Sequence, residues 1–232
     1  MTPLARLHPA PTSEQELLDR ARALAGQTLA SLAQREGVPV PPDLRRAKGW
    51  FGSLLERVLG ATAKSLSEPD FQQIGVELKT IPVNRRGVPV ETTFVCTIPL
   101  VHVGDMEWRQ SRVYKKLRRV LWVPVMGERQ IPVAERRIGT ALLWSPTPEQ
   151  EADLRWDWEE LAGMIGVGDH EQITARLGQF LQVRPKAANS KARTTGYDAE
   201  GLRTAVLPRG FYLRTRFTQR VLQEQLLMPS GE

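Results

Sequence analysis

Two carboxylates and a lysine occur at a spacing suited to holding a metal ion beside a reacting phosphate. Asp70 is followed after six intervening residues by Glu77, and Lys79 lies two positions further on. The segment 75–81 alternates in polarity, so a strand there would place Glu77 and Lys79 side by side on one face. Pro69 disfavours a helix before it and favours an extended start at Asp70. The pattern therefore predicts that the carboxylates of Asp70 and Glu77 converge.

Magnesium is the ion that suits this pair of carboxylates. Mg²⁺ prefers hard oxygen ligands, and one or two carboxylates plus a substrate phosphate commonly hold it in phosphoryl transfer. The Lys79 ammonium would orient an attacking water and offset the negative charge that builds on the phosphate. The alternative is that Glu77 and Lys79 form a solvated strand face and Asp70 a turn, because so loose a pattern also recurs by accident.

A third acid, Glu56, lies on a helix predicted upstream. The apolar residues of segment 50–59 recur at helical spacing, which indicates a core helix. Glu56 is either a polar edge of that helix or a carboxylate that supports the metal site from outside the ligand set. The spacing does not separate these two interpretations.

The remaining elements are those of an α/β protein. Proline residues at 39, 41 and 42 indicate a loop between the first helices and the helix at 50–59. Thr147-Pro148-Glu149-Gln150 has the form of a capping box and predicts a long helix through Met164. The other expected helices lie near 16–24, 28–37, 171–177 and 218–227, and the expected strands near 71–74, 76–81, 92–99, 120–125, 180–183 and 210–214.

Composition favours an anionic partner and excludes several chemistries. The 232 residues suffice for one large domain, residues 1–232, and carry a net charge of +6. No apolar run reaches the length of a membrane span, and the polar N-terminus lacks a signal-peptide core, so we expect a cytoplasmic protein. Cys96 is the only cysteine and is expected to be a buried hydrophobe. The scattered histidines form no zinc pattern, and no phosphate-binding P-loop motif is present.

Basic residues gather in two segments, where most are expected to be solvated or to face phosphates. The first segment is 109–119, and the second runs from Arg184 to Arg220. Within the second, Arg184, Pro185 and Lys186 form what we call the recognition tip, a rigid pair of cations suited to the O6 and N7 acceptors of guanine. The acids of the helix after Thr147 are expected to be solvated: Glu149, Glu151, Asp153, Asp157, Glu159 and Glu160.

Many short strings along nearly the whole chain resemble the MutH family, whose members are strand-discriminating endonucleases of bacterial mismatch repair. The resemblance implies an α/β fold with a restriction-endonuclease-like core, a mixed sheet flanked by helices, and two lobes around a DNA-binding cleft. The strings include Lys48-Gly49-Trp50, Leu54-Leu55-Glu56, Asp70-Phe71, the segments 75–82, 91–96 and 119–125, Leu143-Trp144-Ser145-Pro146, the segment 157–161, Arg184-Pro185-Lys186 with the residues up to Asn189, and the segment 207–213.

The resemblance also implies roles for individual residues. Asp70 and Glu77 would bind Mg²⁺, Lys79 would serve the water, and Glu56 and Lys116 would support the metal site. Lys48 is placed toward the catalytic centre as a DNA contact. The DNA-binding set is completed by Glu91, Phe94, Arg184, Pro185, Lys186 and Tyr212.

Tyr212 is the expected methylation sensor. A close contact of Tyr212 with the adenine N6 amino group in the major groove would be crowded by an N6-methyl group. Without the resemblance, Tyr212 would be taken as an ordinary strand aromatic, and Phe94 could equally belong to the core. The stretches 192–204 and 101–107 match the family poorly, so any contacts they make are not implied by it.

The resulting hypothesis is a monomeric endonuclease that nicks the unmethylated strand of double-stranded DNA, 5′ to the guanine, at hemimethylated GATC. The resemblance implies activation by MutL, with MutS acting indirectly. One alternative is a GATC-specific type II restriction endonuclease that cuts both strands. Another is a non-catalytic DNA-binding module, although the presence of Asp70, Glu77 and Lys79 together speaks against it.

Overall fold

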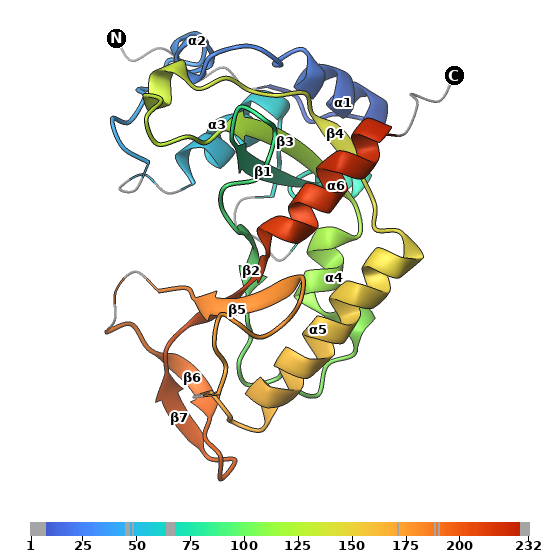
Figure 1. The fold of residues 1–232 in the computed structure, drawn as a ribbon, viewed down its shortest axis with the longest axis vertical. Helices are drawn as coiled ribbons and strands as arrows, with labels where there is room; N and C mark the ends of the chain where they lie inside the picture. The colour runs from blue at the N-terminus through green and yellow to red at the C-terminus, as the bar shows by residue number, and fades with distance from the viewer. Residues whose placement is uncertain are drawn as a thin grey trace. The chain divides into compact units, whose positions relative to one another are not determined.

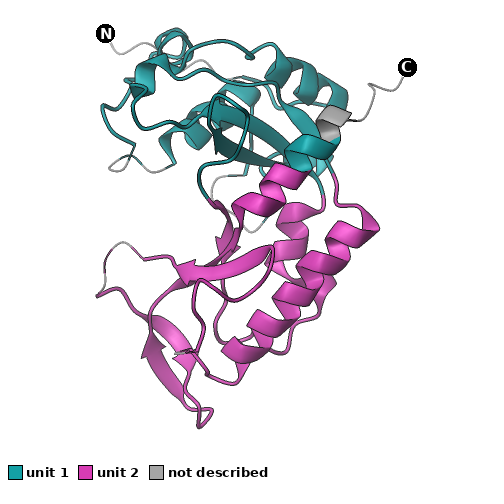
Figure 2. Cartoon of the chain, viewed as in Figure 1, with its two compact units in different colours: residues 1–91, 119–144, 221–232 teal, residues 92–118, 145–220 magenta. Residues whose placement is uncertain are grey.

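The chain folds into two compact units, each assembled from segments that are separate in the sequence. A computed structural model describes residues 8–44, 47, 49–63, 68–170, 172–187, 189 and 191–227. Figure 2 shows unit 1 in teal and unit 2 in magenta. Unit 1 comprises residues 1–91, 119–144 and 221–232, and unit 2 comprises residues 92–118 and 145–220.

Unit 1 is built on a mixed sheet with the strand order β1-β3-β4. β1 (Glu77–Val83) runs parallel to β3 (Val120–Met126), which pairs on its other edge with antiparallel β4 (Leu142–Trp144). β3 is buried over most of its length, as a run of Val, Leu and Trp residues predicts for a strand between two neighbours. β4 was not predicted, since three residues give no readable alternation.

Helices complete the core of unit 1 (Figure 1). They are α1 (Glu14–Arg22), α2 (Leu29–Arg35) and α3 (Trp50–Leu59), and α3 packs against β1. Ser13 and Thr28 cap α1 and α2 through their hydroxyl oxygens. The apolar face of α3 is buried, as its spacing predicted: Phe51, Leu54, Leu55, Val58 and Leu59.

Unit 2 contains an antiparallel sheet with the strand order β2-β8-β5. Its strands are β2 (Thr93–Thr97), β8 (Arg209–Leu213) and β5 (Leu181–Pro185), with a bulge in β2 between Phe94 and Cys96. The side chains on one face are buried: Cys96, Leu181, Val183, Phe211 and Leu213. The expectation that Cys96 is a small buried hydrophobe is thus confirmed.

Two helices pack against this sheet, and a third follows it. α4 (Arg112–Leu117) packs beside β2, and α5 (Pro148–Gly166) packs beside β5. The predicted capping box is present at Thr147 and Gln150. α6 (Thr215–Leu227) follows β8 directly.

A separate hairpin of β6 (Thr194–Tyr197) and β7 (Arg203–Val206) also belongs to unit 2. It was not predicted, because its strands carry polar residues on both faces and show no apolar alternation. Among the residues that the structure describes, no helix is long and apolar enough to cross a membrane.

Two of the predicted elements are wrong. Residues 71–74 form a short 3-10 helix (Gln72–Ile74) in place of a strand, because the chain reverses there through Gly75, whose φ is +66°. Residues 172–177 form turns in place of the expected helix. Their carbonyl groups are bound by arginine side chains instead of by a helical ladder.

Candidate active site and recognition surface

A tight reversal brings Asp70 back beside the start of β1. Phe71 and Val76 form an antiparallel bridge in which each backbone N–H donates to the other's carbonyl oxygen, at 2.9 and 3.3 Å. Continuing this register by one residue places Asp70 opposite Glu77, in the type of pair whose side chains approach most closely. The chain reversal thus takes up the six residues that separate Asp70 from Glu77 in the sequence.

Backbone contacts fix Asp70 on two sides. Its Oδ2 accepts a hydrogen bond from the N–H of Leu78 at 2.9 Å. Its carbonyl oxygen accepts from the N–H groups of Thr62 and Ala63, at 2.9 and 3.2 Å. One oxygen of the Asp70 carboxylate is therefore held at the start of β1, one residue beyond Glu77.

Glu77 and Lys79 form a nearly buried ion pair. Lys79 Nζ lies 2.6 Å from Glu77 Oε1, and the two side chains are 11% and 4% exposed. They share one face of β1, as the period of two in the sequence predicted. Burial of a carboxylate is costly unless a cation or hydrogen bonds compensate it, so this contact holds a charge in place beside Asp70.

The backbone of Glu77 is anchored through a neighbouring strand. Its N–H donates to the carbonyl oxygen of Arg119 at 3.0 Å, immediately before β3 begins. The Arg119 guanidinium in turn binds the carboxylate of Glu14 on α1, with Nε 2.8 Å from Oε1. A chain of contacts from α1 therefore fixes the start of β1.

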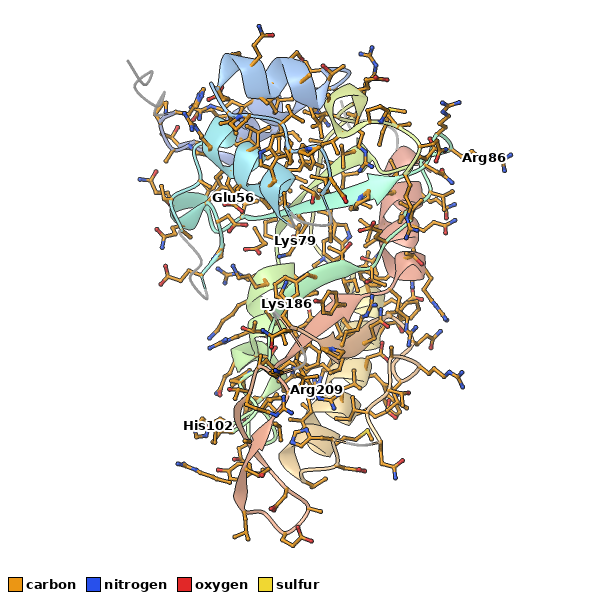
Figure 3. All side chains as sticks on the ribbon, turned by 90° about the vertical axis from the view of Figure 1, so that its left-hand side faces the viewer. Glu56, Lys79, Arg86, His102, Lys186 and Arg209 are labelled. Carbon is orange, nitrogen blue, oxygen red and sulfur yellow. The ribbon has the colours of Figure 1, made fainter. Side chains whose placement is uncertain are left out.

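The supporting residues differ in how they relate to this pair. Glu56 lies on α3, the helix packed against β1, and is half-buried; Figure 3 labels Glu56 and Lys79 in unit 1. Lys116 lies on α4 in unit 2 and is only 8% exposed. Lys48 lies outside the described residues. The roles expected of these three residues remain predictions.

The donor set suits a hard divalent cation. Across the described part of the chain, no group of three or more histidine, cysteine, aspartate or glutamate residues could hold a metal ion. Asp70 and Glu77 offer only carboxylate oxygens, which fits Mg²⁺ completed by water and phosphate and does not fit zinc.

A second cluster, in unit 2, contains most of the residues expected to read DNA. Phe94 on β2 lies directly opposite Tyr212 on β8, with ring centroids 5.3 Å apart in an edge-to-face contact. The Arg184 guanidinium lies 5.7 Å from the centre of the Tyr212 ring, and Lys186 Nζ lies 4.2 Å from the centre of the Phe94 ring. Both cations of the recognition tip are thus stacked on aromatic rings, in cation–π geometry.

Two residues that sequence reasoning did not single out shape this cluster. Thr92 Oγ1 accepts a hydrogen bond from Arg184 Nη1 at 3.0 Å. Gly210 has no side chain where a Cβ would lie 2.9 Å from Phe94 Cε2 and 3.4 Å from Lys186 Cβ. An isolated glycine in a strand is a known sign of close approach, so Gly210 could have been found from the sequence. Nothing in the sequence indicated the bond from Arg184 to Thr92.

Burial raises the pKa of Tyr212 above its ordinary value, with a smaller opposing effect from the positive charge of Arg184. The phenol therefore stays protonated at neutral pH and remains able to donate a hydrogen bond.

Glu91, in unit 1, is exposed and lines a cavity of about 240 Å³ together with Trp50 and Pro82. Pro185 pairs with Arg209 in the sheet register.

Several basic residues expected to be solvated or to face phosphates instead stabilise the fold. Arg209 donates to the carbonyl oxygens of His170 and Ile173, and Arg214 donates to those of Ala175, Leu177 and Gly178. Burial lowers the pKa of both arginines, although the group stays charged.

Arg220 lies 3.1 Å from Asp153 and 3.2 Å from Glu149. It is therefore a poor candidate for a phosphate contact. The charge pattern of the sequence did not reveal these long-range partners.

Asp157 corrects a second expectation. It was expected to be solvated but is 3% exposed, and its carboxylate accepts the N–H groups of Gln179, Phe180 and Leu181 at 2.6–2.7 Å. Asp157 thus fixes the start of β5, the strand that ends in the recognition tip. Glu151 is also engaged, accepting the indole N–H of Trp108 at 3.0 Å.

The fold and the site together define an α/β protein with a carboxylate pair and a lysine of the kind used by metal-dependent nucleases. The model of the family described as "DNA mismatch repair enzyme MutH" matches residues 59–157. The chain belongs to the MutH family.

Similarity to individual proteins extends over nearly the full chain. The chain is 56% identical to the DNA mismatch repair protein MutH of Vibrio cholerae, over 94% of this chain and 98% of that protein. It is 53% identical to MutH of Klebsiella pneumoniae strain 342, over 98% and 99% of the two chains. It is 52% identical to MutH of Vibrio parahaemolyticus, over 97% and 100%.

Proposed function

We propose that this chain is a Mg²⁺-dependent endonuclease of DNA mismatch repair that nicks the unmethylated strand 5′ to the guanine of hemimethylated GATC. The observation that carries the proposal is the reversal that sets Asp70 opposite Glu77 while Lys79 contacts Glu77. Family membership supports the repair function, and each of the relatives named above is a mismatch repair protein.

The reaction is hydrolysis of one phosphodiester bond. Asp70 and Glu77 would hold Mg²⁺, which supplies Lewis-acid stabilisation of the phosphate charge when bound. Lys79 exchanges its contact with Glu77 for one with the attacking water, and its ammonium balances the negative charge that develops on the phosphate oxygens. By resemblance to the family, Glu56 and Lys116 would support the metal site.

Strand choice would come from the aromatic and cationic cluster of unit 2. Arg184 and Lys186 have the donors that match guanine O6 and N7, and Pro185, the last residue of β5, restricts the backbone between them. The Tyr212 hydroxyl would contact the adenine N6 amino group, where a methyl group would crowd it. Phe94, Glu91 and Lys48 are proposed as further DNA contacts.

The proposal extends to partners. The chain contains one catalytic set, which supports a monomer that cuts one strand at each encounter. Its resemblance to the family supports activation by MutL, with MutS acting upstream, in the cytoplasm. A GATC-specific restriction endonuclease would share the site but cut both strands, and no observation favours it.

Supercoiled plasmid containing hemimethylated GATC distinguishes the possibilities. With Mg²⁺, we expect open circles and little linear DNA, and no cutting after chelation or on a plasmid without GATC. Linear product at early times would favour the restriction enzyme. Intact supercoils with Mg²⁺, at protein concentrations that bind the plasmid, would contradict the proposed activity.

A further inference from the structure

The β6–β7 hairpin has two faces of different character. Thr195 pairs with Ala205 and Tyr197 with Arg203, so these four residues share what we call the outer face. The other face carries Gly196 and is directed toward His170. The outer face is mostly exposed and contains no acidic residue.

Contacts on the inner side fix the hairpin to the rest of unit 2. His170 Nε2 lies 2.9 Å from the carbonyl oxygen of Tyr197. A Cβ added to Gly196 would lie 3.3 Å from His170 Nε2, and one added to Gly168 would lie 2.0 Å from the carbonyl oxygen of Asp198. These close approaches hold β6 against residues 168–170, which follow α5, and β7 is held by its pairing with β6, so the hairpin is a defined arm (Figure 1).

Two cations of this segment, Arg203 on the hairpin and Lys191 just before it, are exposed to solvent. Within the part of the chain that the structure describes, neither Arg203 nor Lys191 makes an ion pair, and both are exposed. This contrasts with Arg209, Arg214 and Arg220, whose guanidinium groups bind carbonyl oxygens or acids of unit 2. Positive charge exposed beside a tyrosine and a threonine hydroxyl matches the donors that usually bind nucleic-acid phosphates.

The arm is continuous with the recognition tip. The N–H of Lys186 donates to the carbonyl oxygen of Pro208 at 2.8 Å, which closes the loop from which both the tip and the hairpin extend. A strand of four residues spans roughly 13 Å. That length corresponds to about four base pairs of duplex, at about 3.4 Å per step along one strand.

We propose that the outer face of the hairpin, together with Lys191 near its base, binds backbone phosphates of duplex DNA on one side of the recognition sequence. The contact would supply affinity and register without reading bases. This inference rests on the proposed function, because it assumes that the recognition tip binds GATC. It extends the DNA-binding surface to a segment whose sequence resembles the family poorly.

The test compares binding to three hemimethylated GATC duplexes. One has 12 base pairs on both sides of GATC, and the other two have either the left or the right flank shortened to 2 base pairs. Binding is measured in Ca²⁺ at several salt concentrations. We expect wild type to lose about tenfold in affinity when one particular flank is shortened, as removal of two exposed ion contacts would give. The double variant Lys191→Ala/Arg203→Ala should bind the long duplex as weakly as wild type binds that short one.

The salt dependence gives a second readout. Each phosphate contact contributes about 0.9 to the slope of log K against log salt, so the double variant should reduce the slope by about 2. Arg203→Lys should retain most of the slope, and Arg155→Ala, which removes a cation paired with Glu159 on α5, should leave it unchanged.

The inference would be overturned if the double variant kept the wild-type dependence of affinity on flank length and the wild-type salt slope. It would also be overturned if the variant bound DNA normally and lost only its stimulation by a protein partner. A circular-dichroism melt shows whether the variants remain folded. If wild type itself fails to nick the long duplex in Mg²⁺, the proposed function fails, independently of the arm.

Discussion

In the proposed mechanism Glu77 must satisfy two demands that normally oppose each other, since its carboxylate is nearly buried and would also have to bind a cation. Lys79 meets both demands by neutralising the charge at 2.6 Å while contributing a donor that can move to a water molecule. In the proposed mechanism the pair is structural before substrate binds and catalytic afterwards.

The first prediction concerns this pair. Glu77→Ala should lower nicking by about 10²–10³-fold or more, because it removes a metal ligand and a charged group next to the reacting phosphate. Affinity for GATC duplex should change by less than about threefold, since the basic surface supplies it. Nicking and binding are measured on the same preparation. Wild-type-like nicking by this variant would show that Glu77 is not a ligand.

The second prediction concerns Tyr212. Tyr212→Ser should narrow the difference in nicking between hemimethylated and fully methylated duplexes by an amount equivalent to about 1–3 kcal/mol. The control is Arg203→Ala, which should weaken binding to both duplexes alike; Arg220 is unsuitable as a control because it pairs with Asp153. Equal losses on both duplexes in Tyr212→Ser would mean that the tyrosine is structural.

At the scale of elements, β8 depends on Gly210 to bring Phe94 and Lys186 together. Gly210→Ala should separate them, because the new Cβ would lie 2.9 Å from the Phe94 ring. We expect about a tenfold loss of GATC-specific over nonspecific binding, the size of one base contact. Gly163→Ala on α5, where a Cβ meets nothing within 4 Å, is the matched control and should be neutral or slightly stabilising. Unchanged specificity in Gly210→Ala would contradict the role.

The start of β5 gives a stability prediction. Asp157→Ala removes a carboxylate that accepts three backbone N–H groups and leaves them in a partly buried site. The free energy of unfolding should fall by about 3–5 kcal/mol, measured by urea denaturation. Glu160→Ala, an exposed position on the same helix, should change it by about 0.5 kcal/mol or less. Similar midpoints for both variants would show that the network is dispensable.

Elements with a strong local signal could be predicted from the sequence. The alternation around Glu77 placed it beside Lys79, and the capping box located the start of α5. The 3-10 turn before Gly75 was predicted as a strand, because the chain reverses through the positive φ of one glycine and the apolar pattern does not reveal that turn. The partners of Asp157 and Arg220 lie at least 22 residues away, and periodicity contains no information at that range.

At the scale of the whole molecule, stability should depend on pH through His170. Burial, the largest effect, lowers the pKa of this histidine below 6.5, and the nearby charge of Arg209 adds to it. The backbone bond to Tyr197 and the charge of Asp169 oppose the shift. Its Nδ1 is buried without a hydrogen-bond partner among the described residues, so the protonated ring would bury an unpaired N–H.

Because folding disfavours protonation of His170, the unfolded chain binds more protons at this residue than the folded chain does at pH values between the folded pKa and 6.5. The contribution of neutral His170 to stability is therefore full above 6.5 and is lost as pH falls through the folded pKa. We expect the free energy of unfolding to drop between pH 7.5 and 5.5 in wild type and to drop less in His170→Gln. Identical pH profiles for the two proteins would exclude this linkage.

The order of the segments along the chain has a consequence for proteolysis and for engineering. The polypeptide crosses between the units at four points, near residues 91, 118, 144 and 220. A single cut therefore cannot release unit 1 intact, and any contiguous stretch that contains the whole of unit 1 also contains unit 2. If unit 1 carries the chemistry and unit 2 the recognition, as proposed, a single cut would not release a nuclease unit that lacks sequence preference. Grafting another specificity onto this scaffold would need coordinated junctions at all four crossings.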